Sequence, residues 1–242
     1  MNELSILQKW VDESRKIVFF GGAGVSTESG IPDFRSTDGL YRQQYAYPPE
    51  TVISRPFFDR HPEIFFDFYR NRMICLEAEP NAAHLKLAEL ERAGRLQAVV
   101  TQNIDGLHQL AGSRRVYELH GSIHRNICRR CGKTYTARQV KDWPDPVPRC
   151  PCGGIIKPDV VLYGEPLDEA TLQGAAEAVA GAEILIVGGT SLAVYPAAGL
   201  VDLYRGNRLV LINRDPTPQD RRADLLIRGS IGEILGGISV SL

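Results

Sequence analysis

Short apolar runs alternate with amphipathic helical patterns along most of the 242-residue chain. Apolar runs bounded by turn residues predict buried strands, whereas apolar residues at i, i+3 and i+4 predict helices that cover a core. The predicted strands are residues 17–20, 98–101, 116–119, 184–187 and 209–212, and the predicted helices lie within 1–16, 82–93, 169–180 and 197–204. Continuous apolar strands separated by helices are typical of a parallel sheet that is covered on both faces.

Two segments interrupt this pattern. Residues 31–73 are rich in Pro, Phe, Tyr and Arg and predict helical pieces, and residues 124–157 hold four of the five cysteines with too few apolar residues for a core of their own. We therefore predict an α/β protein with a Rossmann-like, doubly wound parallel sheet. Residues 1–30, 74–123 and 158–242 would form this sheet domain, with a cofactor-loop and helical insertion at 31–73 and a small zinc-binding lobe at 124–157.

Charge and cysteine content narrow the class of protein. The 28 Lys and Arg residues balance 29 Asp and Glu residues, so a formal charge of -1 creates no strong field for nucleic acid or a membrane. No run approaches the ~20 apolar residues of a membrane-spanning helix, and the first residues lack a basic-then-apolar export signal. An odd cysteine count is typical of a reducing compartment. We expect a cytoplasmic protein that binds neither membranes nor nucleic acid directly.

The first predicted strand leads into a glycine-rich turn at residues 21–26. Glycines after a strand allow the phosphates of a dinucleotide to approach backbone amides. The usual fingerprint is incomplete, because Thr27 replaces its third glycine and no acidic residue closes a second strand about 20 residues later. A tight turn that requires positive φ is the alternative explanation.

Other predicted strands also end in small or polar residues. Residues 188–191 read Gly-Gly-Thr-Ser, and Asn213 follows the strand at 209–212. Because ligands of open α/β sheets lie outside the carboxyl ends of the strands, these ends and the first turn together predict one nucleotide cleft.

Gln102, Asn103, Asp105 and His120 follow two further strands. An imidazole with an ordinary pKa near ~6.5 suits a general base at neutral pH, although a lone histidine at a strand end is more often a packing or capping residue. The neighbouring polar residues favour the catalytic interpretation of His120.

The clustered cysteines form two pairs, Cys128 with Cys131 and Cys150 with Cys152. This separation predicts a tetrahedral zinc site with four thiolate ligands, which has no open position and is therefore structural. Metal binding would supply folding energy to a lobe with few apolar residues. The second pair is Cys-x-Cys instead of the commoner Cys-x-x-Cys, which strains Cys152 as a ligand, and reduced, metal-free thiols are the alternative. Cys75 stands apart and is expected to be buried.

Taken in order, these motifs resemble the sirtuin family over nearly the whole chain. The matching blocks are residues 22–26, 30–35, 101–108, 120–121, the cysteine lobe, 157–165, 188–191 and Asn213. The resemblance implies an NAD-dependent protein-lysine deacylase that consumes NAD+. In the family, the acyl oxygen attacks C1′ of the nicotinamide ribose, and a histidine, here His120, deprotonates a ribose hydroxyl. The products are free lysine, nicotinamide and an O-acyl-ADP-ribose.

The resemblance also implies which residues contact the two substrates. The implied cofactor contacts are Phe34, Gln102, Asn103, Ile104 and Asp105 around the nicotinamide and its ribose, Ala23, Thr27 and Arg35 at the phosphates, and Thr190, Ser191, Asn213 and Ile231 along the adenosine half. Residues 160–165 would bind an acyl-lysine protein substrate as an extended peptide by strand addition. An intra-loop ion pair with Asp33 is the alternative role of Arg35.

The preferred acyl group follows from two opposing features. Tyr69 and Arg72, at i and i+3 of a predicted helix, resemble the Tyr-x-x-Arg pair that binds the acyl carboxylate in desuccinylating sirtuins. Asp33 and Thr37 depart from the residues that accompany this pair in that branch, and Arg72 could equally be a solvated helix charge. We predict deacetylation with weak desuccinylation. Protein ADP-ribosyltransfer and a zinc-ribbon scaffold with a vestigial cleft are alternatives, whereas the incomplete fingerprint disfavours an oxidoreductase.

Overall fold

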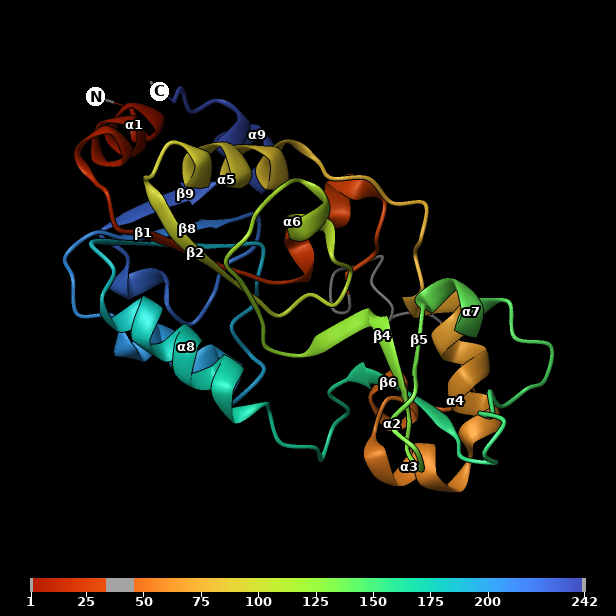
Figure 1. The fold of residues 1–242 in the computed structure, drawn as a ribbon. Helices are drawn as coiled ribbons and strands as arrows, with labels where there is room; N and C mark the ends of the chain where they lie inside the picture. The colour runs from red at the N-terminus through yellow and green to blue at the C-terminus, as the bar shows by residue number, and fades with distance from the viewer. Residues whose placement is uncertain (1, 34–45, 241–242) are drawn as a thin grey trace.

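The structure, a computed structural model, describes residues 2–33 and 46–240. These residues form a larger lobe around a six-stranded sheet and a smaller lobe around a three-stranded sheet (Figure 1). Within the described ranges, no helix combines the length and the apolar character needed to cross a membrane.

The large sheet is entirely parallel. Its strands are β1 (Ile17–Gly21), β2 (Leu96–Thr101), β3 (Val116–Glu118), β7 (Ile184–Gly188), β8 (Leu209–Asn213) and β9 (Leu225–Arg228), in the order β3-β2-β1-β7-β8-β9. The order reverses between β1 and β7, which is the switch point where doubly wound sheets bind nucleotides. The predicted doubly wound parallel sheet is confirmed.

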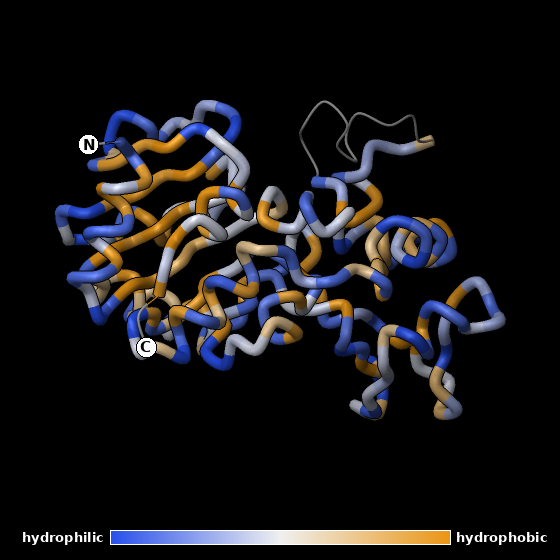
Figure 2. Tube along the Cα trace, turned by 90° about the horizontal axis from the view of Figure 1, so that it is seen from above, coloured by the Kyte–Doolittle hydropathy of each residue, from blue (hydrophilic) through white to orange (hydrophobic). Residues whose placement is uncertain are grey.

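Helices cover both faces of this sheet. The helices α1 (Glu3–Glu13), α5 (Ala82–Arg92) and α9 (Ile231–Gly236) lie on one face, and α8 (Glu169–Ala180) and the 3-10 helix η5 (Ala197–Leu203) lie on the other (Figure 1). Within β1, Ile17 and Phe19 pack into the first core, whereas Val18 and Phe20 pack into the second. Figure 2 shows hydrophobic residues concentrated along the inner segments of the large lobe and hydrophilic residues on many of the segments around them.

The small lobe combines the two insertions. Its sheet has the order β5-β4-β6, formed by β5 (Thr134–Tyr135), β4 (Gly121–Cys128) and β6 (Ile156–Val160). Around it lie α2 (Pro49–Val52), α3 (Arg55–Arg60), α4 (Pro62–Phe68), the π-helix η4 (Tyr69–Met73) and α7 (Ala137–Lys141). Phe58, Phe65 and Phe66 share one hydrophobic core with Ile156 and Val160. The cysteine-rich segment therefore obtains its core from the helical insertion, while the predicted domain boundaries stay a prediction.

Most predicted elements of the large lobe are present, with boundaries that shift by one to a few residues. The helix expected at 197–204 is a 3-10 helix that spans Ala197–Leu203. It follows Pro196 and contains Gly199, a poor helix former. The sequence patterns did not predict β9 or the small sheet. Short elements complete the described chain: the 3-10 turns η1 (Ala23–Val25), η2 (Thr27–Ser29) and η6 (Asp220–Arg222), and α6 (Leu107–Leu110).

Candidate functional site

Two glycine-containing loops meet at the switch point of the large sheet. Gly21 of β1 pairs with Gly188 of β7, so both strands end at the same level. Beyond them the Gly24 amide donates to the Gly189 carbonyl over 2.8 Å, and a Cβ on Gly24 would lie 2.8 Å from the Gly189 Cα. Of residues 21–24 none has positive φ. The explanation by a strained turn is therefore wrong for this motif, because glycine is required there by the close approach of two backbones.

A buried serine connects the loops that follow β1 and β2. The Ser26 hydroxyl donates to Asp105 Oδ2 over 2.6 Å and accepts a hydrogen bond from Asn103 Nδ2 over 3.0 Å. The other Asp105 oxygen accepts the Leu107 amide over 2.9 Å. These bonds hold the Asp105 carboxylate and the Asn103 amide in one arrangement at the carboxyl edge of the sheet. Ser26 had no assigned role in the sequence, although it lies within the glycine-rich motif.

An asparagine that the sequence analysis did not single out supports the same loop. Asn81 Nδ2 donates to the Val25 carbonyl over 2.7 Å and to Ser29 Oγ over 3.0 Å. Asn81 also caps the N-terminus of α5 together with His84. Asn-x-x-His before an apolar helix is a capping pattern that could have identified Asn81 from sequence.

The strand β4 supports the Asp105 loop from the small lobe. Its pairing with β6 is irregular over residues 122–126. Within this irregular stretch the Ile123 amide donates to the Ile104 carbonyl over 3.0 Å, and His124 Nε2 lies 2.8 Å from the Asp105 carbonyl oxygen. The backbone of the predicted nicotinamide-binding loop is thus held by residues of both lobes.

His120 lies between the large sheet and the small sheet. Its Nδ1 lies 3.0 Å from the Gln102 carbonyl oxygen. Because a carbonyl oxygen only accepts, Nδ1 carries the proton and Nε2 keeps its lone pair. Burial lowers the pKa of His120, against the opposing effect of the bond to Gln102. The imidazole is therefore neutral at neutral pH, as a general base must be.

Gly121 allows the chain to turn from His120 into β4. Its φ is +73°, and a Cβ at this position would lie 1.8 Å from the Asp159 carbonyl oxygen. Any side chain would push β6 away from the junction. The His-Gly pair is therefore explained by geometry: the glycine lets His120 lie directly beside the small sheet.

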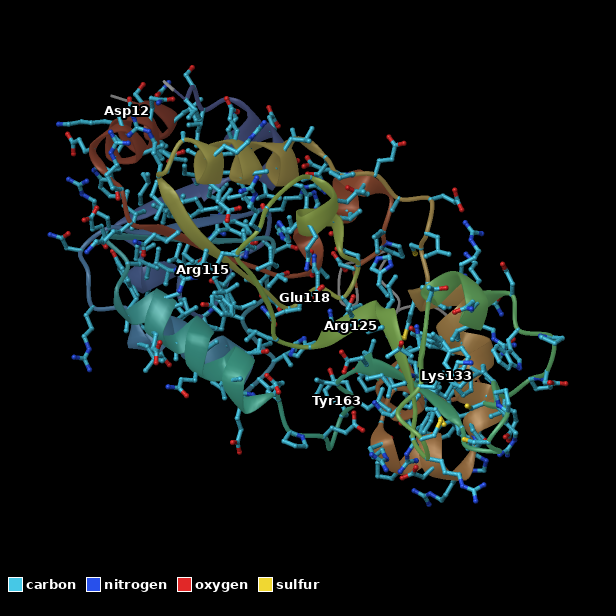
Figure 3. The ribbon with its side chains drawn as sticks, viewed as in Figure 1. Asp12, Arg115, Glu118, Arg125, Lys133 and Tyr163 are labelled. Carbon is cyan, nitrogen blue, oxygen red and sulfur yellow. The ribbon has the colours of Figure 1, made fainter. Side chains whose placement is uncertain are left out.

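Ion pairs join the two lobes next to His120. Arg125 of β4 contacts Glu118 Oε2 at the end of β3 and Asp159 Oδ2 of β6, both over 2.7 Å. Figure 3 shows Glu118 and Arg125 at the junction of the two lobes, with Tyr163 on the segment after β6.

On the predicted adenosine side, the residues expected in the cleft lie together. The Thr190 amide donates to Asn213 Oδ1 over 3.1 Å, and Asn213 Nδ2 donates to the Thr190 carbonyl over 2.6 Å. Gln102 Nε2 donates to Thr190 Oγ1 over 2.9 Å, which joins the two halves of the predicted cleft. Ser191 is exposed beside them.

Three other predicted cofactor contacts, Ala23, Thr27 and Ile231, lie in different parts of the large lobe. Ala23 and Thr27 lie in the turns η1 and η2, where the Thr27 hydroxyl donates to the Gly24 carbonyl over 3.0 Å. The Ile231 side chain is buried in the large core and packs against Gly188, the last residue of β7. Phe34, Arg35 and Thr37, and with them the alternative ion pair to Asp33, lie outside the described residues.

Cys75 is half buried and lines a cavity of about 240 Å³ together with Leu110 and His124, next to the Asp105 backbone. The expectation that Cys75 is simply buried is therefore wrong. Burial raises the pKa of its thiol, which makes it a poor nucleophile at neutral pH.

The four clustered cysteines fit a structural metal ion. The Sγ atoms of Cys128, Cys131, Cys150 and Cys152 all lie within 4.8 Å of one another. The Cys128–Cys152 and Cys131–Cys150 sulfur pairs are 3.5 and 3.6 Å apart, close to the roughly 3.8 Å between thiolates that bind one zinc at Zn–S distances of about 2.3 Å. The Arg130 amide points at Cys128 Sγ over 3.4 Å. The Cys-x-Cys spacing brings Cys152 into the cluster, and the sulfur atoms lie within the small lobe near Lys133 (Figure 3).

The segment predicted to bind a peptide is partly paired within the protein. The amides of Val161 and Tyr163 donate to the carbonyls of His120 and Ile53 over 2.9 and 3.0 Å, and the Tyr163 carbonyl accepts an amide of α3 over 2.9 Å. Strand addition to residues 160–165 can therefore use only the remaining backbone groups. The bond from Val161 to His120 connects this segment directly to the candidate base.

Tyr69 and Arg72 do not share a helix face. Tyr69 is fully buried, with its hydroxyl near Asn126 Oδ1 at 3.3 Å and the Ile123 carbonyl at 3.4 Å, whereas Arg72 is exposed. Both lie in the π-helix η4, which turns less per residue than an α-helix and moves residues three apart onto different faces. The predicted α-helical pair is wrong for this reason.

The fold and these contacts define the class of protein: a dinucleotide-binding α/β protein with a metal-stabilised lobe and a neutral histidine between the lobes. A sequence model of the Sir2 family matches residues 22–196. The NAD-dependent protein deacetylase of Clostridium acetobutylicum is 57% identical over 238 residues, which cover 97% of each chain. The chain therefore belongs to the Sir2, or sirtuin, family.

Solved Sir2 structures have the same fold. A Sir2 complex with a p53 peptide and NAD+ matches with a TM-score of 0.85 at 40% identity, covering 97% of this chain and 96% of that chain. A Sir2 histidine-to-alanine variant with deacetylated p53 peptide and 3′-O-acetyl ADP ribose matches with a TM-score of 0.89 at 40% identity, covering 98% of this chain and 99% of that chain.

Proposed function

We propose that the chain is an NAD-dependent protein-lysine deacetylase. The position of His120 carries this proposal. Its Nδ1–H is fixed by the Gln102 carbonyl, its Nε2 is a free base, and its own carbonyl accepts the Val161 amide of the predicted peptide segment. A neutral histidine thus lies between the carboxyl edge of the large sheet and the candidate substrate strand, and the relatives are named for this activity.

The residues divide the chemistry between them. The acetyl-lysine oxygen attacks C1′ of the nicotinamide ribose of NAD+, and nicotinamide leaves. His120 Nε2 then accepts a proton from a ribose hydroxyl, which attacks the acetyl carbon. The lysine amine leaves with a proton, and one water molecule adds to the acetyl carbon, so that free lysine and O-acetyl-ADP-ribose are the products. Asp105 and Asn103 would orient the nicotinamide end from the Ser26 network, and Thr190, Ser191 and Asn213 would hold the adenosine end.

The substrate and location follow from other features. The solved neighbours carry peptides, and residues 160–165 would hold an acyl-lysine protein substrate as an extended strand. The four cysteines would hold one structural Zn²⁺, which requires reduced thiolates and favours a cytoplasmic location. The balanced formal charge of -1 supports the prediction that nucleic acid is not a partner.

Acetyl groups are preferred over succinyl groups in this proposal. The Tyr69 hydroxyl is directed at Asn126 inside the small core, so it is withdrawn from any acyl carboxylate. Succinyl recognition by a Tyr-x-x-Arg site would need both the Tyr69 hydroxyl and Arg72. Without the Tyr69 hydroxyl, only half of that site is present.

Product analysis tests the proposal. Purified protein is incubated with acetyl-, longer-acyl- and succinyl-lysine peptides, with and without NAD+, and products are followed by mass. We expect NAD+-dependent loss of acetyl with formation of nicotinamide and O-acetyl-ADP-ribose. Transfer of ADP-ribose onto the peptide, or no reaction, would contradict the assignment.

A further inference from the structure

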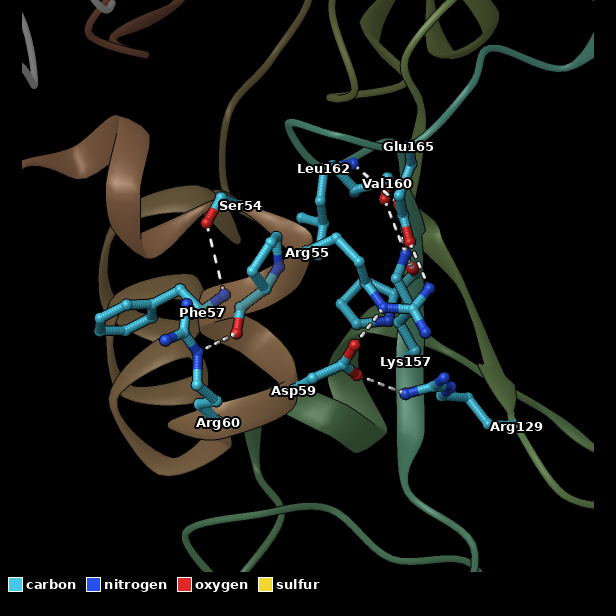
Figure 4. Close-up of polar contacts among 12 residues, drawn as sticks. Ser54, Arg55, Phe57, Asp59, Arg60, Arg129, Lys157, Val160, Leu162 and Glu165 are labelled. Carbon is cyan, nitrogen blue, oxygen red and sulfur yellow. Dashed lines mark hydrogen bonds and ion pairs between the residues drawn. The ribbon is translucent and has the colours of Figure 1, made fainter.

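Behind the predicted peptide segment lies a cluster of charged residues that the reaction does not use. It comprises Arg55 and Asp59 of α3, Arg129 after β4, Lys157 of β6, and Glu165 (Figure 4). These residues come from three separate parts of the small lobe. Lys157 and Glu165 flank residues 160–164, so a bond between them closes the segment into a loop.

Glu165 is the centre of this cluster. Its Oε2 accepts the Leu162 amide over 2.9 Å and lies 3.0 Å from Lys157 Nζ, while its Oε1 accepts Arg55 Nη1 over 2.9 Å. Both the Lys157 and Glu165 side chains are only 14% exposed. A carboxylate in such a setting persists because all of its contacts are donors, two of them cationic.

The Lys157 ammonium has three hydrogen-bond partners, one for each of its N–H groups. Beside Glu165, its Nζ donates to the Val160 carbonyl over 2.9 Å and to the Pro158 carbonyl over 3.0 Å. The ammonium therefore ties the end of β6 to the far end of the loop. Burial lowers the pKa of Lys157 and is opposed by Glu165. Burial alone would raise the pKa of Glu165, but the Leu162 amide and the cations lower it overall, so Glu165 is ionised at neutral pH.

We propose that Glu165, with Lys157 and Arg55, is a positioning clasp that sets the backbone of residues 160–164 for the substrate peptide. This inference rests on the proposed function. The clasp bonds the Leu162 amide and the Val160 carbonyl, and so fixes the backbone on both sides of Val161, whose amide donates to the His120 carbonyl. Because Arg55 belongs to α3, its bond to Glu165 anchors the clasp on α3 rather than on the large sheet. Substrate affinity, and not cofactor affinity, is therefore the property that it controls.

The substitution Glu165→Gln tests the clasp, since it keeps the size of the side chain and removes the charge that faces two cations. We expect the KM for an acetyl-lysine peptide to rise about tenfold or more, with the KM for NAD+ within about twofold of wild type. The matched control is Asp59→Asn, which removes the other carboxylate bonded to Arg55 but leaves the Leu162 and Lys157 bonds intact. Its peptide KM should stay within about twofold.

Each outcome decides the matter. An unchanged peptide KM in Glu165→Gln, an equal rise in Asp59→Asn, or a parallel rise in the KM for NAD+ overturns the clasp. If Glu165→Gln does not fold, as judged by melting and zinc content, Arg55→Gln removes only the outer contact. Its peptide KM should then rise about threefold at constant NAD+ KM, and no rise overturns the proposal. Absence of turnover by the wild-type chain contradicts the proposed function itself, and with it the clasp.

Discussion

The two lobes of this protein are stabilised by different forces. The large lobe buries apolar side chains on both faces of a parallel sheet, and all five residues of β1 are buried. The small lobe has a three-stranded sheet, an aromatic core contributed largely by α3 and α4, a four-cysteine cluster and the Glu165 clasp. The first lobe relies on hydrophobic burial, whereas the second adds a four-cysteine metal site and part-buried ion pairs to its aromatic core. We therefore expect that substitutions in one lobe perturb cofactor binding and substrate binding to different extents, with His120 between the two lobes.

The largest expected effect is at the junction itself. We expect His120→Ala to lower kcat by about 10²–10⁴-fold, the usual range for a positioned base, while the Kd for NAD+ stays within about tenfold. Steady-state kinetics and calorimetric NAD+ titration measure the two quantities. Near wild-type turnover would remove His120 from the mechanism.

The substitution Asp105→Ala tests the predicted nicotinamide contact independently of His120. Since Asp105 is predicted to hold the nicotinamide carboxamide, we expect exchange of free labelled nicotinamide into NAD+ to fall by roughly tenfold or more. Exchange at the wild-type rate would mean that Asp105 is wrongly placed.

Loss of the metal should affect the two lobes differently. We expect about one zinc per chain by elemental analysis, and Cys128→Ala or chelation should unfold the small lobe because metal binding contributes its folding energy. Peptide turnover should disappear while NAD+ still binds the large lobe within roughly tenfold. Metal-free protein with an unchanged melting profile would contradict a structural role for zinc.

Acid should weaken the large lobe in particular. Burial lowers the pKa of His84, and burial together with His84 lowers that of His108 to about 3. The unfolded chain binds these protons first, so the stabilisation is complete above about pH 6.5 and is lost as the pH falls toward the folded pKa, by up to about 1.4 kcal/mol per pH unit for each histidine. Urea unfolding between pH 7 and pH 5 measures the slope. His108→Leu should flatten it, and an unchanged slope would exclude His108 as its source.

The smallest expected effect is at Arg72. Because Tyr69 is turned into the core, Arg72→Met should change kcat/KM for acetyl peptides by less than about twofold. The same kinetics on matched succinyl peptides should show a much lower value for the wild type. A wild-type preference for succinyl above about tenfold would overturn the acyl assignment.

Whether the sequence predicts an element depends on what stabilises that element. The strands β1, β7 and β8 were predictable because burial on both faces makes them continuously apolar, whereas β9 is a four-residue edge strand and β6 contains Pro158. Strand ends carrying Gly, Asn, Asp and His identified the candidate cleft. The contact from Ser26 to Asp105 and the clasp from Lys157 to Glu165 were not predictable, because neither spacing follows a helical or strand period. The π-turn at Tyr69 likewise leaves no periodic signal.

The central position of β1 has a consequence for synthesis of the chain. Its neighbours in the sheet are β2 and β7. The strand β2 begins at residue 96, 75 positions after the last residue of β1, and β7 begins at residue 184. At about 5–20 residues per second, β7 leaves the ribosome roughly ten to thirty seconds after β1. During that interval one edge of a fully apolar strand has no partner. We expect nascent chains to need a holding chaperone until β7 has emerged, and slower translation of the middle third of the message to increase aggregation.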